Sequence, residues 1–128
     1  MGRLTASVTI ENLLDNSESF RCDALVDTGK SHLVLPSAWR DRLGSLQHFG
    51  TLDFETATQS LVPGEIFGPV KIQVEGFRSI SSEVVFMDME SPDGTFEPLL
   101  GYIRLEQSQI AVDVVGQRLV PVKHLDAK

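Results

Sequence analysis

The segment with the clearest catalytic chemistry is Asp27-Thr28-Gly29, which lies between the apolar runs 24–26 and 33–35. An aspartate at the end of a buried strand is held on a rigid element, and Gly29 permits a tight turn whose N–H groups can hold its carboxylate. Thr28 can anchor the turn through its hydroxyl group. Such a carboxylate can act as a general base or, when protonated, as a general acid. The same three residues also form ordinary β-turns, so the motif by itself leaves both interpretations open.

Two other kinds of site compete with this one. Gly29-Lys30-Ser31 matches the end of the phosphate-binding pattern G-x-x-x-x-G-K-[ST]. The first glycine would have to stand where the chain has Ala24, and an apolar strand follows at 33–35 instead of a long helix. Metal-ligand spacing is missing among the three histidines, His32, His48 and His124. The sequence therefore predicts no nucleotide site, no metal site and no cofactor.

Composition limits the partners. The chain of 128 residues has 11 Lys and Arg against 18 Asp and Glu, a formal net charge of −7, which argues against binding nucleic acid or an anionic membrane surface. No apolar run approaches the ~20 residues of a membrane span, and residues 1–6 lack a signal-peptide core. The single Cys22 cannot form an intrachain disulfide and is expected to be a small buried apolar residue in a reducing compartment. We expect a cytoplasmic protein with one domain, residues 1–128.

The pattern along the chain is typical of short strands separated by turns. Strands are predicted at residues 5–13, 20–26, 33–35, 52–58, 70–74 and 83–86, and a hairpin at 110–115 and 118–122. One helix is predicted over 38–43, with Ser37 as its N-cap and Gly44 after its end, and a second over 102–108. The expected fold class is mostly β, with one or two short helices.

Two segments together resemble the retropepsin-like aspartic proteases, in particular their single-domain bacterial members. The first is Ala24-Leu25-Val26-Asp27-Thr28-Gly29, followed by Ser31 and Leu33-Val34-Leu35-Pro36, which looks like the active-site loop of that family. The second is Pro98-Leu99-Leu100-Gly101, followed by a helix and the strand 110–113, which resembles the family's hydrophobic–hydrophobic–Gly element. The pair at this separation is more specific than either segment alone, and the resemblance covers about residues 7–121.

The resemblance implies a fold and a set of roles. The fold would be a closed, β-barrel-like acid-protease lobe. The catalytic aspartate of the family corresponds to Asp27, and the threonine that grips its counterpart across a dimer corresponds to Thr28. Gly29 would shape the active-site loop, to which Ser31 also belongs. Packing behind the loop, a structural role, would fall to Leu99, Leu100 and Gly101.

The family also has a β-hairpin flap over its substrate. The distance from Asp27 and the strand that follows favour residues 54–61, with the flap at Thr56, Ala57, Thr58 and Gln59. A second possible tip is Pro63-Gly64-Glu65. The expected walls of the cleft are Leu25, Val34, Ile66 and Phe67.

Peptide hydrolysis by carboxylates constrains the quaternary state. Two carboxylates must share one proton, so that one activates a water and the other polarises the carbonyl, as aspartic proteases illustrate. The chain has one Asp-Thr-Gly, and Asp113 is a poor second partner because no glycine follows it and its strand is apolar. We therefore expect a homodimer with Asp27 of each chain at a two-fold axis. The predicted activity is that of an aspartic endopeptidase on a peptide or protein substrate.

Departures from the family pattern leave an alternative open. Many members have a small residue where this chain has Lys30, and an ammonium close to Asp27 would lower its pKa and oppose proton sharing. The expected flap, residues 54–61, contains no glycine. The alternative is a catalytically degenerate homodimer of the same fold that binds peptides or a protein partner.

Overall fold

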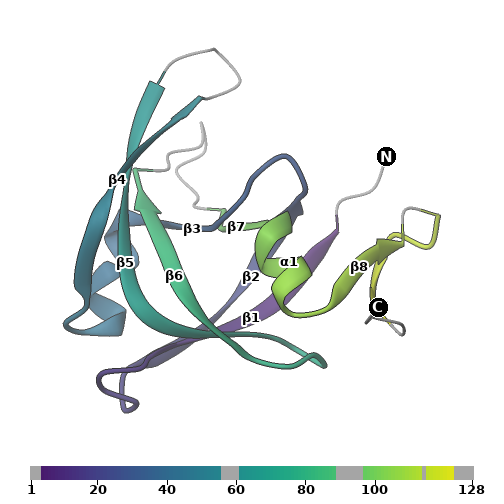
Figure 1. The fold of residues 1–128 in the computed structure, drawn as a ribbon, viewed down its shortest axis with the longest axis horizontal. Coiled ribbons are helices and arrows are strands. Elements are labelled where there is room, and N and C mark those ends of the chain that lie inside the picture. The colour runs from purple at the N-terminus through teal and green to yellow at the C-terminus, as the bar shows by residue number, and fades with distance from the viewer. Residues whose placement is uncertain (1–3, 56–60, 89–96, 114, 123–128) are drawn as a thin grey trace, which may run out of the picture.

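The chain forms strands joined by turns and two short helical segments (Figure 1). The computed structural model describes residues 4–55, 61–88, 97–113 and 115–122. The helical segments are the 3-10 helix η1 (Ser37–Leu43) and α1 (Tyr102–Gln107). The strands are β1 (Thr5–Asn12), β2 (Ser19–Asp27), β3 (Leu33–Pro36), β4 (Gln47–Glu55), β5 (Leu61–Val74), β6 (Ile80–Met87), β7 (Leu99–Gly101), β8 (Ile110–Asp113) and β9 (Arg118–Pro121).

Six of these strands close into a barrel. Their order around it is β1-β2-β7-β3-β6-β5, and β5 pairs again with β1 to complete the ring. Strand β1 is antiparallel to both of its neighbours. Val8 lies opposite Cys22 of β2 on one side and opposite Val74 of β5 on the other. Strand β4 pairs with β5 and continues the sheet outside the ring. The mostly β, closed barrel-like lobe predicted from the sequence is confirmed.

The barrel is filled because its strands alternate between inward and outward positions. In β1 the residues at positions 6, 8, 10 and 12 are buried, and those between them are not. Burying one large apolar side chain contributes about 1.5–3 kcal/mol relative to leaving it exposed. Cys22, which was expected to be buried, is half-buried and packs against this core. The largest fully buried side chains include Phe86, Ile10, Leu33, Leu35, Leu43, Ile72 and Leu100.

A fully buried asparagine ties the end of β1 to the end of η1. The side-chain amide of Asn12 donates to the carbonyl oxygens of Leu43 and Ser45 at 2.7 and 2.8 Å. Its Oδ1 atom accepts a hydrogen bond from the Leu14 N–H at 2.7 Å. These bonds satisfy the polar atoms of a residue with no exposed surface.

The first helical segment differs from its prediction at its start. Strand β3 runs through Pro36, so Ser37 is already the first helical residue, and no side chain caps the segment. The predicted N-cap at Ser37 is therefore wrong. Gly44 ends the segment with φ of 66°, the left-handed conformation that favours glycine at this position.

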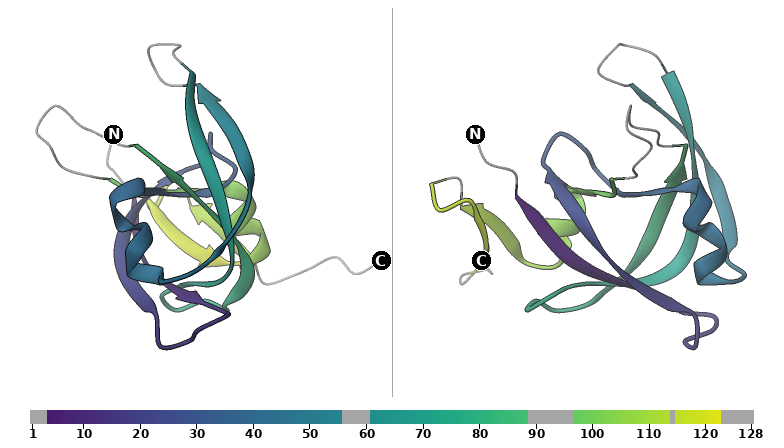
Figure 2. Two further views of the ribbon diagram at one scale, coloured as in Figure 1. Left: turned by 90° about the vertical axis from the view of Figure 1, so that its left-hand side faces the viewer. Right: turned by 180° about the vertical axis from the view of Figure 1, so that it is seen from behind.

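Strand β5 is longer than predicted and serves two parts of the fold. Its first half pairs with β4 in a hairpin that stands out from the barrel, and its second half is a barrel strand (Figure 2). The prolines and glycines of residues 63–69 had indicated turns. Pro63, Gly64 and Gly68 lie inside the strand, where pairing with β4 compensates for their poor strand propensity. The alternative flap tip Pro63-Gly64-Glu65 is thus wrong, since its residues pair with Asp53, Leu52 and Thr51.

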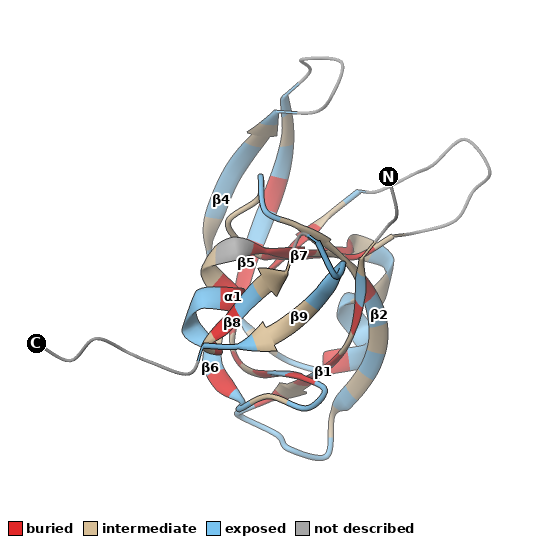
Figure 3. Cartoon of the chain, turned by 90° about the vertical axis from the view of Figure 1, so that its right-hand side faces the viewer, coloured by how far each residue is buried: buried red, intermediate tan, exposed pale blue. Residues whose placement is uncertain are grey.

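Strands β8 and β9 form a separate two-stranded antiparallel sheet, which confirms the predicted terminal hairpin. In the view from the side of this hairpin, β8 and β9 are mostly half-buried or exposed, whereas β7 is largely buried (Figure 3). No helix in the described part of the chain is long and apolar enough to cross a membrane.

Candidate active site

The loop 28–32 leaves the end of β2 and enters β3, and a third strand lies between these two. Strand β7 is parallel to β2, with Gly101 opposite Asp27, and antiparallel to β3, with Leu100 opposite Leu33. The loop therefore crosses over β7 on its way from β2 to β3 (Figure 1). Strand β7 is not predicted from the sequence, because Leu99-Leu100-Gly101 is too short to show alternation.

The loop holds the carboxylate of Asp27 through its own main chain. The Gly29 N–H donates to Asp27 Oδ1 at 2.9 Å, and the Lys30 N–H donates to the Asp27 carbonyl oxygen at 3.1 Å. A Cβ atom at Gly29 would lie 3.2 Å from Asp27 Oδ1, which is tighter than ordinary van der Waals contact. Glycine thus permits the close approach of the turn to the half-buried aspartate.

The side chain of Thr28 differs from its prediction, and that of Lys30 forms no ion pair with Asp27. Thr28 is exposed, and its hydroxyl bonds to no other described residue, so it does not anchor its own turn. Lys30 is half-buried, and no ion pair joins it to Asp27 within the described ranges. The ammonium group is therefore not a direct partner of the carboxylate in one chain.

Gly101 lies against the back of the loop. Its N–H donates to the His32 carbonyl oxygen at 3.0 Å. A Cβ atom there would lie 2.6 Å from the Lys30 carbonyl oxygen and 2.7 Å from the His32 N and O atoms. These contacts are with main-chain atoms, which cannot rotate away, so only glycine fits. Beside it, Leu100 is fully buried in the core, and half-buried Leu99 packs against a smaller apolar cluster.

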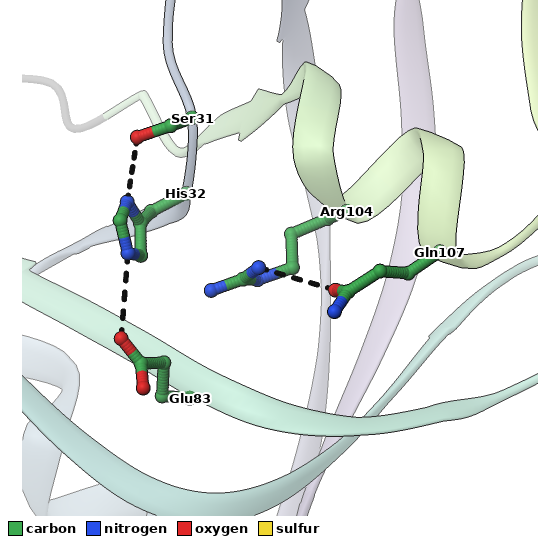
Figure 4. Close-up of polar contacts among 5 residues, drawn as sticks. All are labelled: Ser31, His32, Glu83, Arg104 and Gln107. Carbon is green, nitrogen blue, oxygen red and sulfur yellow. Dashed lines mark hydrogen bonds and ion pairs between the residues drawn. The ribbon is translucent and has the colours of Figure 1, made fainter.

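His32 is a residue of the site that the sequence analysis missed. Its Nδ1 atom lies 2.7 Å from Ser31 Oγ, and its Nε2 atom lies 3.3 Å from Glu83 Oε2 on β6 (Figure 4). Burial lowers its pKa below the ordinary value of 6.5, the Arg104 charge lowers it further, and Glu83 opposes both. From the sequence, His32 was considered only as a metal ligand, and the spacing of the histidines argued against that role. The one available signal was the position of His32 directly after Ser31 in the loop.

The side chain of Arg104, on α1, points toward His32 and Glu83 (Figure 4). Its residue surface is only 5% exposed, and its Nη1 atom donates to Gln107 Oε1 at 3.1 Å. Its buried Nε has no hydrogen-bond partner in the described part of the chain. Burial lowers the pKa of the guanidinium, and Glu83 opposes this effect. A cation thus faces the contact between an imidazole and a carboxylate.

The hairpin β4–β5 approaches the loop through Phe54. The ring of Phe54 lies edge-on to the His32 ring, with 6.4 Å between centroids. A Cβ atom at Gly64 would lie 2.6 Å from the Phe54 ring and 2.7 Å from Val85, so glycine makes room for the ring. Glu55 and Leu61 are the last paired residues of the hairpin. The predicted flap residues, Thr56, Ala57, Thr58 and Gln59, lie outside the described residues.

The predicted cleft walls separate into two groups. Val34 and Ile66 form a small cluster with Val85, against which Phe54, Met87 and Leu99 pack. Phe67 instead belongs to the main core, where its ring meets that of Phe86 with 5.8 Å between centroids. Its assignment to the cleft is wrong, because the register of β5 turns it inward. Leu25 is half-buried in β2, opposite Leu99.

Other candidate groups show little chemistry. Burial raises the pKa of the Cys22 thiol to about 11, so that it is protonated at neutral pH. Within the described residues, no three His, Cys, Asp or Glu side chains come together in a way that could hold a metal ion.

Comparison with known proteins agrees with this geometry. A family model described as aspartyl protease matches residues 6–102. Among solved structures, the chain is similar to the EIAV protease complexed with the inhibitor HBY-793, with a TM-score of 0.61, 23% identity and 93% coverage of each chain. No curated protein shows significant sequence similarity to the chain. Because the family match spans both the loop after β2 and the strand that lies behind it, the chain belongs to the aspartyl protease family and has the retropepsin-like fold.

Proposed function

We propose that the protein is an aspartic endopeptidase whose active site forms between two copies of the chain. Asp27 of each chain would supply one of two carboxylates that share a single proton. The observation that carries this proposal is the geometry at Asp27, where a strand end, the Gly29 N–H and the contacts of Gly101 fix one carboxylate. Its Oδ2 atom bonds to no other described residue and is available for chemistry.

The reaction follows from two carboxylates held close together. Because like charges a few ångströms apart cannot both ionise, one group stays protonated while the other is a carboxylate. The carboxylate takes a proton from a water molecule, whose oxygen bonds to the carbonyl carbon of the peptide. The protonated group hydrogen-bonds to the carbonyl oxygen and stabilises the charge that develops there. The C–N bond then breaks as a proton passes to the leaving amine.

The second carboxylate would come from another copy because the chain offers no suitable one of its own. The sequence contains one Asp-Thr-Gly. Asp113 accepts hydrogen bonds from the Gly116 N–H at 2.9 Å and from Arg118 Nε at 3.1 Å. Both of its oxygens are therefore occupied in the terminal hairpin. A two-fold axis beside Asp27 would complete the site with identical contacts from each chain.

The test is peptide cleavage by the wild type and by Asp27→Asn, using a peptide library between pH 3 and 7. We expect cleavage by the wild type and none above background by the variant. The matched control is Asp23→Asn, an exposed aspartate on the same strand, which should cleave like the wild type. Cleavage that persists in Asp27→Asn would contradict the mechanism.

Dilution tests the shared site separately. If each chain carries half a site, specific activity falls as the dimer dissociates, and sedimentation should show the monomer over the same concentrations. Activity that stays constant in a monomeric sample would contradict the homodimer. A stable dimer that cleaves no peptide would favour the alternative, a binding module of the same fold. The single domain over residues 1–128 and the cytoplasmic location remain predictions from the sequence.

A further inference from the structure

His32 is enclosed by four parts of the molecule. Ser31 of its own loop lies at Nδ1, Glu83 of β6 at Nε2, and Phe54 of β4 edge-on to its ring. Arg104 of α1 faces it without an ion-pair contact (Figure 4). Its side chain is only 16% exposed. The ring thus links the loop after Asp27 to the barrel wall and to the base of the hairpin β4–β5.

One proton arrangement satisfies both polar contacts of the ring. In the neutral form with the proton on Nε2, that N–H donates to the Glu83 carboxylate, and Nδ1 accepts from the Ser31 hydroxyl. The nearby Arg104 cation disfavours a second proton on the ring. The cluster therefore selects one tautomer and gives the ring a defined orientation.

The main chain of His32 is fixed as well. Its carbonyl oxygen accepts the Gly101 N–H at 3.0 Å, and its N and O atoms would both lie 2.7 Å from a Cβ at that position. The loop 28–32 is thus held at its start by Asp27 and at its end by His32. Because the loop is short, a shift at its far end is transmitted to the Gly29 N–H, which holds the Asp27 carboxylate.

We propose that His32, through its contact with Glu83, is a positioning residue that sets the geometry of the loop carrying Asp27. The proposal rests on the protease function proposed above. His32 does not touch the reacting atoms. It acts by holding the loop, so its loss should slow the chemical step more than it weakens substrate binding.

The kinetic test compares His32→Ala, Glu83→Ala and the double variant, each normalised to the concentration of folded dimer. We expect each variant to lower kcat roughly tenfold with KM within about twofold of the wild type. The double variant should lose no more than either single variant, because all three remove the same contact. His32→Gln, whose amide can still donate to Glu83, should recover most of the loss. Additive losses, or a change in KM alone, would overturn the proposal.

The chain offers a matched control in a second histidine–glutamate pair. His48 Nε2 lies 3.7 Å from Glu65 Oε1 on the outer part of the same sheet, and His48 is exposed. His48→Ala and Glu65→Ala should leave kcat within about twofold of the wild type, since an exposed pair contributes little. An equal loss in these variants would overturn the assignment to His32, because it would be a general effect of losing such a pair.

Amide hydrogen exchange provides a test that does not need activity. The Gly29, Lys30 and Gly101 N–H groups all bond within or against the loop. His32→Ala and Glu83→Ala should speed exchange at these amides severalfold and leave the barrel amides of β1 unchanged. Unchanged exchange at all three amides would overturn the proposal even if peptides are cleaved. If the wild type cleaves nothing, the protease function fails, and exchange still decides whether His32 holds the loop.

Discussion

Two aspartates each end a strand and hold the turn that follows, yet their carboxylates have different surroundings. Asp27 ends β2 and accepts the Gly29 N–H at 2.9 Å, and Asp113 ends β8 and accepts the Gly116 N–H at the same distance. Arg118 Nε occupies the second oxygen of Asp113 at 3.1 Å. The second oxygen of Asp27 bonds to no other described residue.

The difference shows that the local turn does not determine the role of its aspartate. Asp113 lies in a two-stranded sheet with few buried residues, so its turn can shift without disturbing the core. The turn of Asp27 has Gly101 directly behind it, and Gly101 follows the fully buried Leu100. A rigid support and a free oxygen atom together distinguish a candidate catalytic carboxylate from one that only stabilises a hairpin.

The largest expected effect separates the two aspartates by activity. Asp27→Asn should lower kcat by about a thousandfold or more, because the proposed mechanism assigns proton transfer in the transition state to this group. Asp113→Asn should leave kcat within about twofold, since it alters only the terminal hairpin. Initial rates on one cleavable peptide, at equal concentrations of folded protein, measure both. Comparable losses in the two variants would mean that the turns do not differ in role.

The next largest effect concerns Gly101 and Gly116, the glycines that lie against the turns of Asp27 and Asp113. In Gly101→Ala the new methyl group meets main-chain oxygen and nitrogen atoms at 2.6–2.7 Å. The loop or β7 must move, which should cost about 3 kcal/mol of unfolding free energy. In Gly116→Ala the methyl group meets Asp113 Oδ2 at 2.6 Å, and this side chain can rotate away.

Urea unfolding of both variants measures this difference. Gly101→Ala should shift the urea midpoint strongly to lower urea, and Gly116→Ala should shift it only slightly. Equal shifts would mean that the loop yields as easily as the exposed hairpin. Gly76→Ala is not a suitable control, because its φ of 89° adds backbone strain of its own.

The sequence predicted the parts of the site that depend on local chemistry. Asp27 and Gly29 are separated by one residue, and a turn with their hydrogen bond can be inferred from residue types alone. Gly101 was expected behind the loop only through resemblance to a family, because nothing in Leu99-Leu100-Gly101 indicates which strands it joins.

The cluster behind the loop could not be predicted from the sequence. His32, Glu83 and Arg104 lie on the loop, β6 and α1, and only the closed barrel brings them together. Strand β5 was shortened in the prediction for a related reason. Its prolines and glycines indicate turns locally, whereas pairing with β4, β6 and β1 keeps the strand continuous. In both cases long-range pairing outweighs local preference.

The pH dependence of stability should reveal the His32 cluster at mildly acidic pH. Since the fold lowers the pKa of His32, the unfolded chain takes up its proton first as pH falls below about 6.5. Because the unfolded state then binds more protons than the folded state, the free energy of unfolding decreases as pH decreases in this window. Urea unfolding between pH 7 and 5 should show this loss in the wild type and less of it in His32→Gln. An identical slope in both proteins would contradict the buried, neutral ring.

The smallest effect belongs to the turn of Asp113, at lower pH. The Gly116 N–H and Arg118 hold the pKa of this carboxyl below its ordinary value of 3.8. Its contribution to stability is therefore present above that value and is lost as pH falls through the folded-state pKa. Asp113→Asn should flatten the decline of Tm between pH 4 and 2.5. This change should be smaller than the effect of His32→Gln on stability between pH 7 and 5, because water and salt screen an exposed pair.

Asp15 provides the matched control for this acidic window. Its pKa is also lowered, by hydrogen bonds from the Ser17 hydroxyl and N–H, and it lies in a different exposed turn. Asp15→Asn and Asp113→Asn should each remove part of the stability that is lost in acid. The two parts should add because the turns do not touch. In 1 M salt the part due to Asp113 should shrink more, since an ion pair to Arg118 contributes to it and none with a described residue contributes to Asp15. Equal salt sensitivity would mean that Arg118 does not hold the carboxylate, and that the two strand-ending aspartates, Asp27 and Asp113, differ less than their contacts indicate.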